Sequence, residues 1–400
     1  MNIPLSRPSI GELEIEHVTR VLRSNQLSLG PTLAAFEESF AAYIGTKHAI
    51  AASSGTAALH MCVRAMGLGC GAEVLTSSFS FVASVNCLLY EGVTPRLIDI
   101  DPDSFNIDPE QLRIFLREKC VRNASGEVID RENGLVVKAI LPVHVFGLPA
   151  EMDAIDRLAA EYGLAILEDS CEAIGATYNG RSVGTFGEAA VFAFYPNKQM
   201  TTGEGGMIVT DNAKIAEQCR SLRNQGRDVD GRWLKHVTLG YNYRLSDIQC
   251  ALGCAQLARI DELLAGRTRV ANRYVELLKG LDLVRLPHVD SRSTRSWFVF
   301  YVQFMGESST SELRNEVREH LANAGIASQT YFPAIHKQPY FIEITGGAQC
   351  DLPVTEWASN TCLAIPFFPS LSEAEIRDVV NTLGEAVQDR TPGALSLKAS

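Results

Sequence analysis

Short apolar stretches rich in β-branched residues alternate with helical patterns through the first 250 residues of the chain. Such stretches predict buried strands, because a strand that is covered on both faces is apolar along its whole length. We predict strands at residues 48–53, 73–76, 95–99, 136–141, 164–169, 189–194 and 207–210.

Two of the segments between these strands have the spacing of an amphipathic helix. Within residues 56–66, apolar and small side chains recur at intervals of three, four and seven residues, and Gly67 follows as a helix stop. Residues 152–162 repeat this pattern and end before Gly163. Alternating strands and helices predict an α/β fold, in which a mainly parallel sheet is sandwiched between helices.

The pattern changes near residue 250. A helical pattern runs from Ser246 to Leu278, and a strand at 297–303 and a helix at 312–323 follow it. A chain of 400 residues also exceeds what a single hydrophobic core usually fills. We therefore predict a large domain over residues 1–250, a smaller C-terminal αβ domain over 251–390 and a flexible tail over 391–400.

Composition and charge narrow the classes of function. The chain is 46% hydrophobic, and 36 Lys and Arg against 47 Asp and Glu give it a formal charge of −11. This acidity disfavours nucleic-acid binding, and neither a secretory segment nor a stretch long enough to cross a membrane is evident. The ten scattered cysteines predict free thiols in the cytoplasm, and no further ligand completes a metal site with Cys250 and Cys254.

Polar residues follow three of the predicted strands, and ligands of open α/β sheets bind beyond the carboxyl ends of strands. Ser53–Thr56 joins a strand to the start of a helix, where free N–H groups can bind an anion, although an ordinary helix cap has the same sequence. Glu168 and Asp169 end an apolar strand. A carboxylate buried there needs a cation or a protonated ring as its partner, and a surface turn is the alternative.

The third strand end carries Lys198, in a glycine-rich connection between two apolar strands. A lysine amine in a partly desolvated site can lose its proton and form a Schiff base, whereas a lysine in a loop is usually a solvated charge. Together, the three strand ends supply a phosphate seat, an acid for a ring nitrogen and an amine for an aldehyde. Pyridoxal 5′-phosphate requires these three groups, and it is the predicted cofactor.

At these residues the sequence resembles the DegT/StrS-type nucleotide-sugar aminotransferases, a branch of the fold-type-I pyridoxal-phosphate enzymes, which are similar in fold to aspartate aminotransferase. The resemblance covers almost the whole chain and rests on the order of its motifs. These are Ser6–Gly11, Ser28–Pro31, Ser53–Leu59, Val143–Gly147, Glu168–Asp169, Val183–Gly187, Lys198 with Thr202–Gly206, Gly240–Arg244, Ile335–Pro339 and Ile365–Pro369.

The resemblance implies roles for individual cofactor-binding residues. Lys198 would form the Schiff base and move the proton, and Asp169 would pair with the pyridinium nitrogen. Gly55 and Thr56 would bind the phosphate, and Phe81 would stack on the cofactor unless it serves only to pack the core.

Three further residues match motifs whose roles extend beyond the cofactor pocket. Asn242 matches a residue that reaches the phosphate of the neighbouring subunit, which implies a homodimer with shared active sites. Arg244 would bind an anionic group of the substrate or pair at the interface, and His336 would line the sugar pocket or serve a structural role.

Two positions depart from the family pattern. Ala193 stands five residues before the lysine, where many relatives have a serine that binds the phosphate, so that contact is either absent or replaced by Ser54 or Tyr195. Glu172 stands three residues after Asp169, where glutamine is common. A carboxyl group beside the cofactor's phenolic oxygen needs a shared proton or a cationic neighbour, because adjacent anions repel each other.

The resemblance predicts a ping-pong aminotransferase that moves an amino group, with L-glutamate as the expected donor, to a nucleotide-linked keto sugar for amino-sugar or polysaccharide synthesis. One alternative is the deoxygenating branch of the family, in which histidine typically replaces the Schiff-base lysine. Another is a pyridoxal-phosphate-binding regulator without catalysis. A nicotinamide dehydrogenase is disfavoured, because Gly67–Gly71 follows a helix and precedes a strand.

Overall fold

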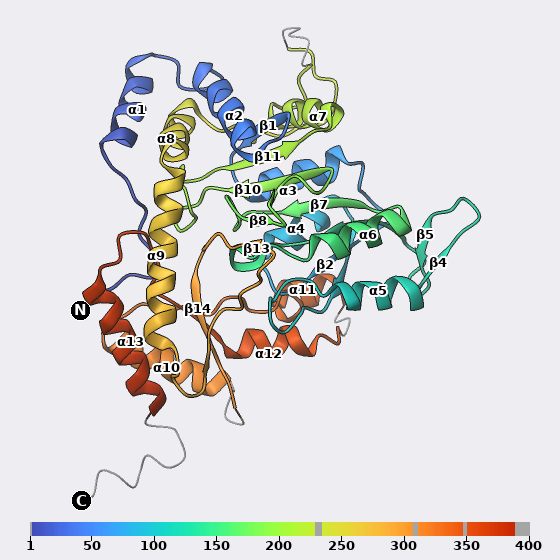
Figure 1. Cartoon of the computed structure of the whole chain (residues 1–400). Coiled ribbons are helices and arrows are strands. Elements are labelled where there is room, and N and C mark those ends of the chain that lie inside the picture. Colours follow the sequence, from blue (N-terminus) through green and yellow to red (C-terminus); the bar gives the residue numbers. More distant parts are fainter. Residues whose placement is uncertain (1, 229–233, 307–310, 347–349, 389–400) are drawn as a thin grey trace, which may run out of the picture.

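The computed structural model describes residues 2–228, 234–306, 311–346 and 350–388. A nine-stranded central sheet contains all of the strands predicted in the first 250 residues, in the order β1-β11-β10-β7-β6-β2-β3 (Figure 1). These strands are β1 (His48–Ala52), β2 (Ala72–Ser77), β3 (Thr94–Ile98), β6 (Val136–Leu141), β7 (Ala165–Asp169), β10 (Ala189–Ala193) and β11 (Gly206–Thr210).

Within this row only β11 runs against its neighbours. It pairs antiparallel with β1 and β10, whereas β10, β7, β6, β2 and β3 pair parallel with one another. The predicted, mainly parallel α/β sheet is therefore confirmed. Because β1 also points the same way as β10, the carboxyl ends of β1, β7 and β10 meet at one edge of the sheet.

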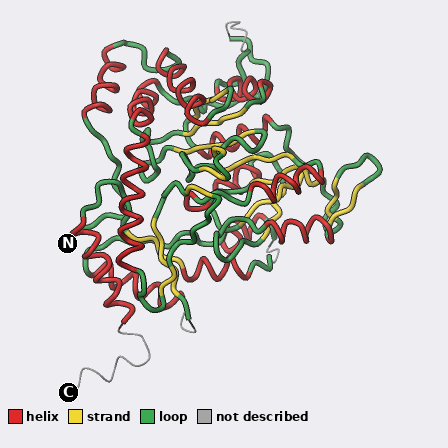
Figure 2. The backbone as a smooth tube through the Cα atoms, viewed as in Figure 1, coloured by secondary structure: helices red, strands yellow, loops and turns green. Residues whose placement is uncertain are grey.

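Alternating side chains of the strands build separate cores on the two faces of the sheet. Ile50 packs on one face against α3 (Gly55–Ala65) and α7 (Ala213–Arg223), and its neighbour Ala51 packs on the other face against α2 (Pro31–Ile44). Helices consequently flank the sheet on both sides (Figure 2). The remaining helices of this part are α1 (Glu12–Arg23), α4 (Ala83–Leu89), α5 (Pro109–Glu118), α6 (Met152–Tyr162) and α8 (Asp247–Ala258).

A second core forms around a three-stranded antiparallel sheet of order β12-β14-β15. The long helix α9 (Ile260–Leu278) runs down to it from α8 along the left of Figure 1. The other elements of this part are β12 (Val284–Arg285), β14 (Phe300–Phe304), β15 (Cys362–Ile365), α10 (Ser311–Asn323), α11 (Pro339–Ile344), α12 (Pro353–Thr361) and α13 (Glu373–Gln388).

The predicted domain boundary at residue 250 falls inside α8. The next helix, α9, adds Ile260 to a core of the large sheet and Tyr274 to the second core, so one helix joins both. The division of the chain into two domains stays a prediction, and the predicted tail at 391–400 lies outside the described residues.

Several short elements were not predicted. The hairpin of β4 (Cys120–Arg122) and β5 (Val128–Asp130) extends the central sheet and projects from its side (Figure 1). A small sheet joins β13 (Ser293–Thr294), β8 (Thr177–Tyr178) and β9 (Arg181–Ser182), and it ties the segment after α9 to the large sheet's loops. Strands of two or three residues are too short to show a period in the sequence.

Candidate active site

A cavity of about 520 Å³ lies where β1, β7 and β10 end. This volume is within the range of small-molecule sites. Six of the nine predicted site residues line it, namely Gly55, Thr56, Phe81, Asp169, Glu172 and Lys198. Asn242, Arg244 and His336 are not among its lining residues.

The N-terminus of α3 forms one wall of the cavity. Ser54 caps the helix, and its hydroxyl oxygen accepts a hydrogen bond from the N–H of Ala57 at 3.0 Å. Within the described part of the chain, no group accepts a hydrogen bond from the N–H of Gly55 or Thr56. Free N–H groups at the positive end of a helix dipole suit an anion, and phosphate binding is the role that the sequence predicts for this turn.

Gly55 lies very close to the end of β10. A Cβ atom added to Gly55 would lie 2.8 Å from the Cβ of Ala193 and 3.1 Å from the Sγ of Cys171. Real Cβ atoms do not approach other carbon atoms so closely, so the seat requires glycine at this position.

Asp169 reaches the cavity from the carboxyl end of β7. Its side chain is buried and accepts hydrogen bonds from the hydroxyl of Ser84 at 2.6 Å and from the N–H of Cys171 at 3.1 Å. These bonds hold the carboxylate in one orientation. Sequence reasoning did not identify Ser84, although it lies only three residues after Phe81 at the start of α4.

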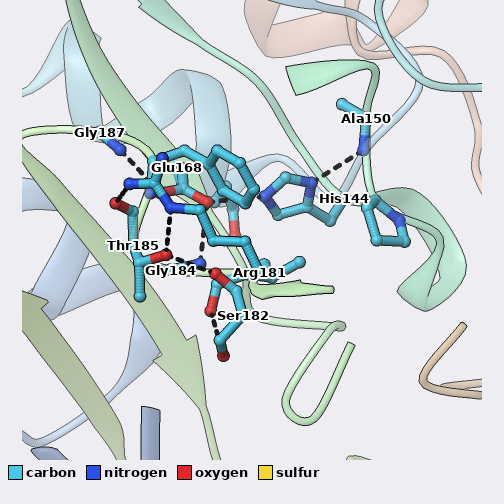
Figure 3. A network of polar contacts seen from close by, with 12 residues as sticks. His144, Ala150, Glu168, Arg181, Ser182, Gly184, Thr185 and Gly187 are labelled. Carbon is cyan, nitrogen blue, oxygen red and sulfur yellow. Dashed lines mark hydrogen bonds and ion pairs between the residues drawn. The ribbon is translucent and has the colours of Figure 1, made fainter. Parts of the chain in front are cut away.

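Its neighbour Glu168 has a structural role in a separate network of polar contacts (Figure 3). The fully buried carboxylate accepts hydrogen bonds from the N–H groups of Gly184, Phe186 and Gly187 at 2.7–2.9 Å. His144 accepts from the N–H of Ala150 through Nδ1, so its Nε2 carries the proton and donates to Glu168 at 3.2 Å. Glu168 therefore fixes the loop after β9. Its partners are N–H donors, and not the cation or protonated ring that the sequence led us to expect for a buried carboxylate here.

Lys198 projects into the cavity from the connection between β10 and β11. Its Nζ lies 3.4 Å from Oε1 of Glu172 and 3.8 Å from the centre of the Phe298 ring, and its side chain is only 12% exposed. The amine is thus held between an anion and an aromatic face rather than solvated in a loop.

Glu172 connects this lysine to the opposite wall. Its Oε2 accepts a hydrogen bond from the N–H of Phe146 at 2.9 Å, and its other oxygen faces Lys198. Burial raises the pKa of the Glu172 carboxyl above its ordinary value, and the Lys198 amine and the Phe146 N–H partly offset this. The cationic neighbour that the sequence required for Glu172 is therefore Lys198.

Aromatic side chains cover much of the rest of the cavity. Phe81 is 60% exposed, which is unusual for a residue of its kind and excludes simple core packing. Three more aromatic residues line the cavity from the segments before β14 and after α10, namely Phe298, Tyr331 and Phe332. Sequence reasoning missed these three, because nothing in their local pattern connects them with residues more than 100 positions earlier.

Comparison with known proteins identifies the family. Residues 8–384 match the sequence profile of the DegT/DnrJ/EryC1/StrS aminotransferase family, which is nearly the whole chain. The chain belongs to the DegT/DnrJ/EryC1/StrS aminotransferase family.

The chain also matches individual relatives over nearly the whole length of both proteins. GDP-perosamine synthase of Caulobacter vibrioides is 37% identical over 96% of this chain and 98% of its own, and the spore coat polysaccharide biosynthesis protein SpsC of Bacillus subtilis is 34% identical over 98% of both. In structure, Helicobacter pylori PseC, an aminotransferase involved in the biosynthesis of pseudoaminic acid, aligns with a TM-score of 0.88 and 26% identity over 97% of this chain and all of its own.

The cofactor of this aminotransferase family is pyridoxal phosphate, and the cavity has groups suited to each part of it. The unoccupied N–H groups at the start of α3 suit a phosphate, the oriented Asp169 carboxylate suits a pyridinium nitrogen, and the exposed ring of Phe81 suits a flat heterocycle. The amine of Lys198 suits an aldehyde. The residues therefore fit the cofactor.

The three remaining predicted residues lie elsewhere in this aminotransferase. Asn242 is exposed, and Arg244 donates a hydrogen bond to the side chain of Asn224 at 3.0 Å. His336 is buried and shares hydrogen bonds with Ser78 at 2.7 Å and Glu356 at 3.2 Å. The contacts of His336 agree with the structural alternative, and the roles predicted for all three residues stay predictions.

Neither a metal-ligand cluster nor a membrane-spanning helix occurs in the described part of the chain. Its residues hold no group of three or more His, Cys, Asp or Glu side chains that could bind a metal ion. None of its helices is both long and apolar enough to pass through a lipid bilayer.

Proposed function

We propose that this aminotransferase transfers an amino group from L-glutamate to a keto sugar that is linked to a nucleotide, in the synthesis of an amino sugar. The relatives named above support a sugar as the substrate, because perosamine and pseudoaminic acid appear in their descriptions. The observation that carries the proposal is the convergence of Lys198, Asp169 and the start of α3 on one cavity.

When bound, the cofactor supplies an aldehyde that takes up amino groups and a ring that accepts electrons. In the proposed reaction, Lys198 binds the cofactor and then moves a proton at Nζ. Asp169, held by Ser84, would pair its carboxyl group with the ring nitrogen. Glu172 orients the Nζ atom of Lys198, and the aromatic side chains around it exclude water.

The retained lysine supports transamination over deoxygenation, because the deoxygenating branch of the family typically carries histidine at this position. The same lysine and its ordered neighbours Glu172 and Phe298 support a catalytic protein over a non-catalytic regulator. No observation favours a second candidate function.

We also infer a homodimer with shared sites. Lys198 is the only basic side chain among the described residues that line the cavity. One chain therefore offers few positive charges to a cofactor phosphate and an anionic nucleotide. The exposed Asn242 is available to supply a contact across an interface. A cytosolic setting is part of the proposal, and the ten free cysteines support it.

A substrate panel tests the proposed reaction. Protein loaded with pyridoxal phosphate is mixed with L-glutamate and a series of nucleotide-linked keto sugars, and the products are identified by mass. We expect 2-oxoglutarate and one aminated nucleotide sugar, and no product with the Lys198→Ala variant. Failure of the loaded enzyme to convert glutamate, together with failure to aminate any keto sugar, would contradict the proposal.

A further inference from the structure

A buried arginine without a carboxylate partner lies behind the wall of the cavity. Arg267 belongs to α9, is only 2% exposed and forms no ion pair within the described part of the chain. Burial lowers the pKa of its guanidinium to about 10, which still leaves it charged at neutral pH. Burying an unpaired cation is costly, and an apolar side chain of similar size would usually stabilise the fold as well or better.

Main-chain oxygens take the place of a carboxylate. One guanidinium nitrogen of Arg267 donates to the carbonyl oxygens of Asn197 at 3.2 Å and Lys198 at 2.6 Å. A second guanidinium nitrogen donates to those of Trp297 at 3.4 Å and Phe298 at 3.0 Å. A single side chain therefore joins two segments that lie about 100 residues apart in the sequence.

Both joined segments determine where the amine of Lys198 lies. One segment carries the lysine itself, and the other carries Phe298, whose ring centre lies 3.8 Å from Nζ. Two of the four carbonyl groups that Arg267 binds belong to Lys198 and Phe298 themselves, and these are the two shorter hydrogen bonds. One planar, rigid guanidinium thus fixes the main chain of Lys198, which carries Nζ, and the main chain of Phe298, whose ring Nζ contacts.

The two segments also have a second, independent tie. The side-chain nitrogen of Gln199 donates to the carbonyl oxygen of Glu172 at 2.5 Å and to the hydroxyl oxygen of Ser296 at 2.9 Å. This tie joins the same parts of the chain without Arg267. Variants of Arg267 should consequently keep the loops near each other while losing the exact alignment of Lys198.

We propose that Arg267 is a positioning residue for Lys198, which acts through the main chain of residues 197–198 and 297–298 and touches neither cofactor nor substrate. This inference rests on the proposed role of Lys198. A small displacement of a reacting group costs about a hundredfold in rate, so the loss of Arg267 should lower kcat far more than it raises KM.

The test compares Arg267→Met and Arg267→Lys with the wild type and with Arg273→Met. Arg273 is a matched control on the same helix, because its ion pairs with Glu276 and Glu373 lie at the surface. Three quantities are measured: the fraction of bound cofactor that borohydride attaches to Lys198, kcat and KM for the amino donor, and the melting temperature.

For Arg267→Met we expect cofactor binding within about threefold of the wild type, because the seat at α3 is not touched by Arg267. We expect the attached fraction to fall and kcat to fall about a hundredfold, with KM changed less than about threefold. Arg267→Lys keeps the charge and some of the donors, so it should recover at least about a tenth of the lost kcat. Arg273→Met should match the wild type in all three quantities.

A folded Arg267→Met protein with wild-type kcat and attached fraction would overturn the inference. If that variant does not fold, Arg267→Lys decides: an unchanged kcat at an unchanged melting temperature overturns it, and a reduced kcat supports it. A wild-type enzyme that shows no adduct at Lys198 would instead refute the proposed function, so the two failures are distinguishable.

Discussion

At the scale of single residues, chemistry depends on which way a side chain points. Glu168 and Asp169 are consecutive carboxylates at the end of the same strand, and the sequence assigned the cofactor role to Asp169 only through the family resemblance. The structure gives the physical distinction, because alternation along β7 sends Glu168 to a set of backbone donors and Asp169 into the cavity.

Glu172→Gln is predicted to retain activity and to change the acid side of the pH profile. Burial raises the pKa of Glu172, so as the pH falls this carboxyl is protonated earlier than an exposed one. Below that pKa, the protonated carboxyl of Glu172 and the amide that replaces it in the variant are both neutral. The values of kcat/KM for wild type and variant should therefore converge. Above it only the wild type has a negative charge 3.4 Å from Nζ of Lys198, and the two should differ by roughly tenfold or less.

The measurement is kcat/KM for the amino donor across the pH range in which both proteins stay folded. Glu188→Gln is the control, because Glu188 is an exposed glutamate that does not line the cavity. Complete loss of activity in a folded, cofactor-bound Glu172→Gln protein would show that the carboxylate is essential, contrary to the prediction.

At the scale of elements, the strands that end at the site and helix α3 were predictable from the pattern of apolar residues, whereas α4 was not predicted. The Lys198 connection and the start of α3 follow strands whose apolar character is continuous, so both could be located in the sequence. Phe298 and Tyr331 could not, because their place in the cavity depends on how the second core packs against the first sheet. The hairpin of β4 and β5 was not predicted for a different reason, because strands of three residues are too short to show a periodic pattern.

Gly55→Ala is predicted to disrupt the anion seat. The new methyl group would meet Ala193 and Cys171, so the start of α3 must move away from the end of β10. We expect cofactor affinity to fall at least about tenfold and stability to fall by about 1–3 kcal/mol, as for overpacked sites. Cofactor titration and thermal unfolding measure the two effects.

Gly384→Ala provides the control for this substitution. Gly384 lies in α13, a Cβ atom added to it would meet no atom within 4 Å, and alanine favours the helix. This variant should keep wild-type cofactor affinity. Equal affinities for the wild type and Gly55→Ala would mean that the phosphate does not bind at the start of α3.

At the scale of the whole molecule, the cavity joins the carboxyl edge of the large sheet to residues that neighbour the second core. Such a site depends on the relative placement of segments from both ends of the chain, which no local pattern encodes. In the proposed dimer the site would also depend on the placement of the neighbouring subunit, because Asn242 would act in the partner's site.

Mixed dimers test whether Asn242 is shared. Asn242→Ala alone should weaken cofactor binding roughly tenfold to a hundredfold, as expected for one lost hydrogen bond to a charged group. In a hybrid of Lys198→Ala and Asn242→Ala chains, the Lys198-bearing site would receive an intact Asn242 from its partner. Hybrids should therefore regain wild-type affinity and activity in half of their sites. A hybrid without such recovery would place Asn242 in its own subunit's site, and wild-type affinity of the Asn242→Ala protein alone would place Asn242 outside the site.

Covalent trapping tests whether the amine of Lys198 captures the cofactor. The wild-type protein and the Lys198→Ala variant are saturated with pyridoxal phosphate, reduced with borohydride, digested and analysed by mass spectrometry. We predict a reduced adduct on the wild-type peptide that contains Lys198, and none on the corresponding peptide of the variant. A wild-type protein that binds the cofactor but carries no adduct at Lys198 would contradict this prediction.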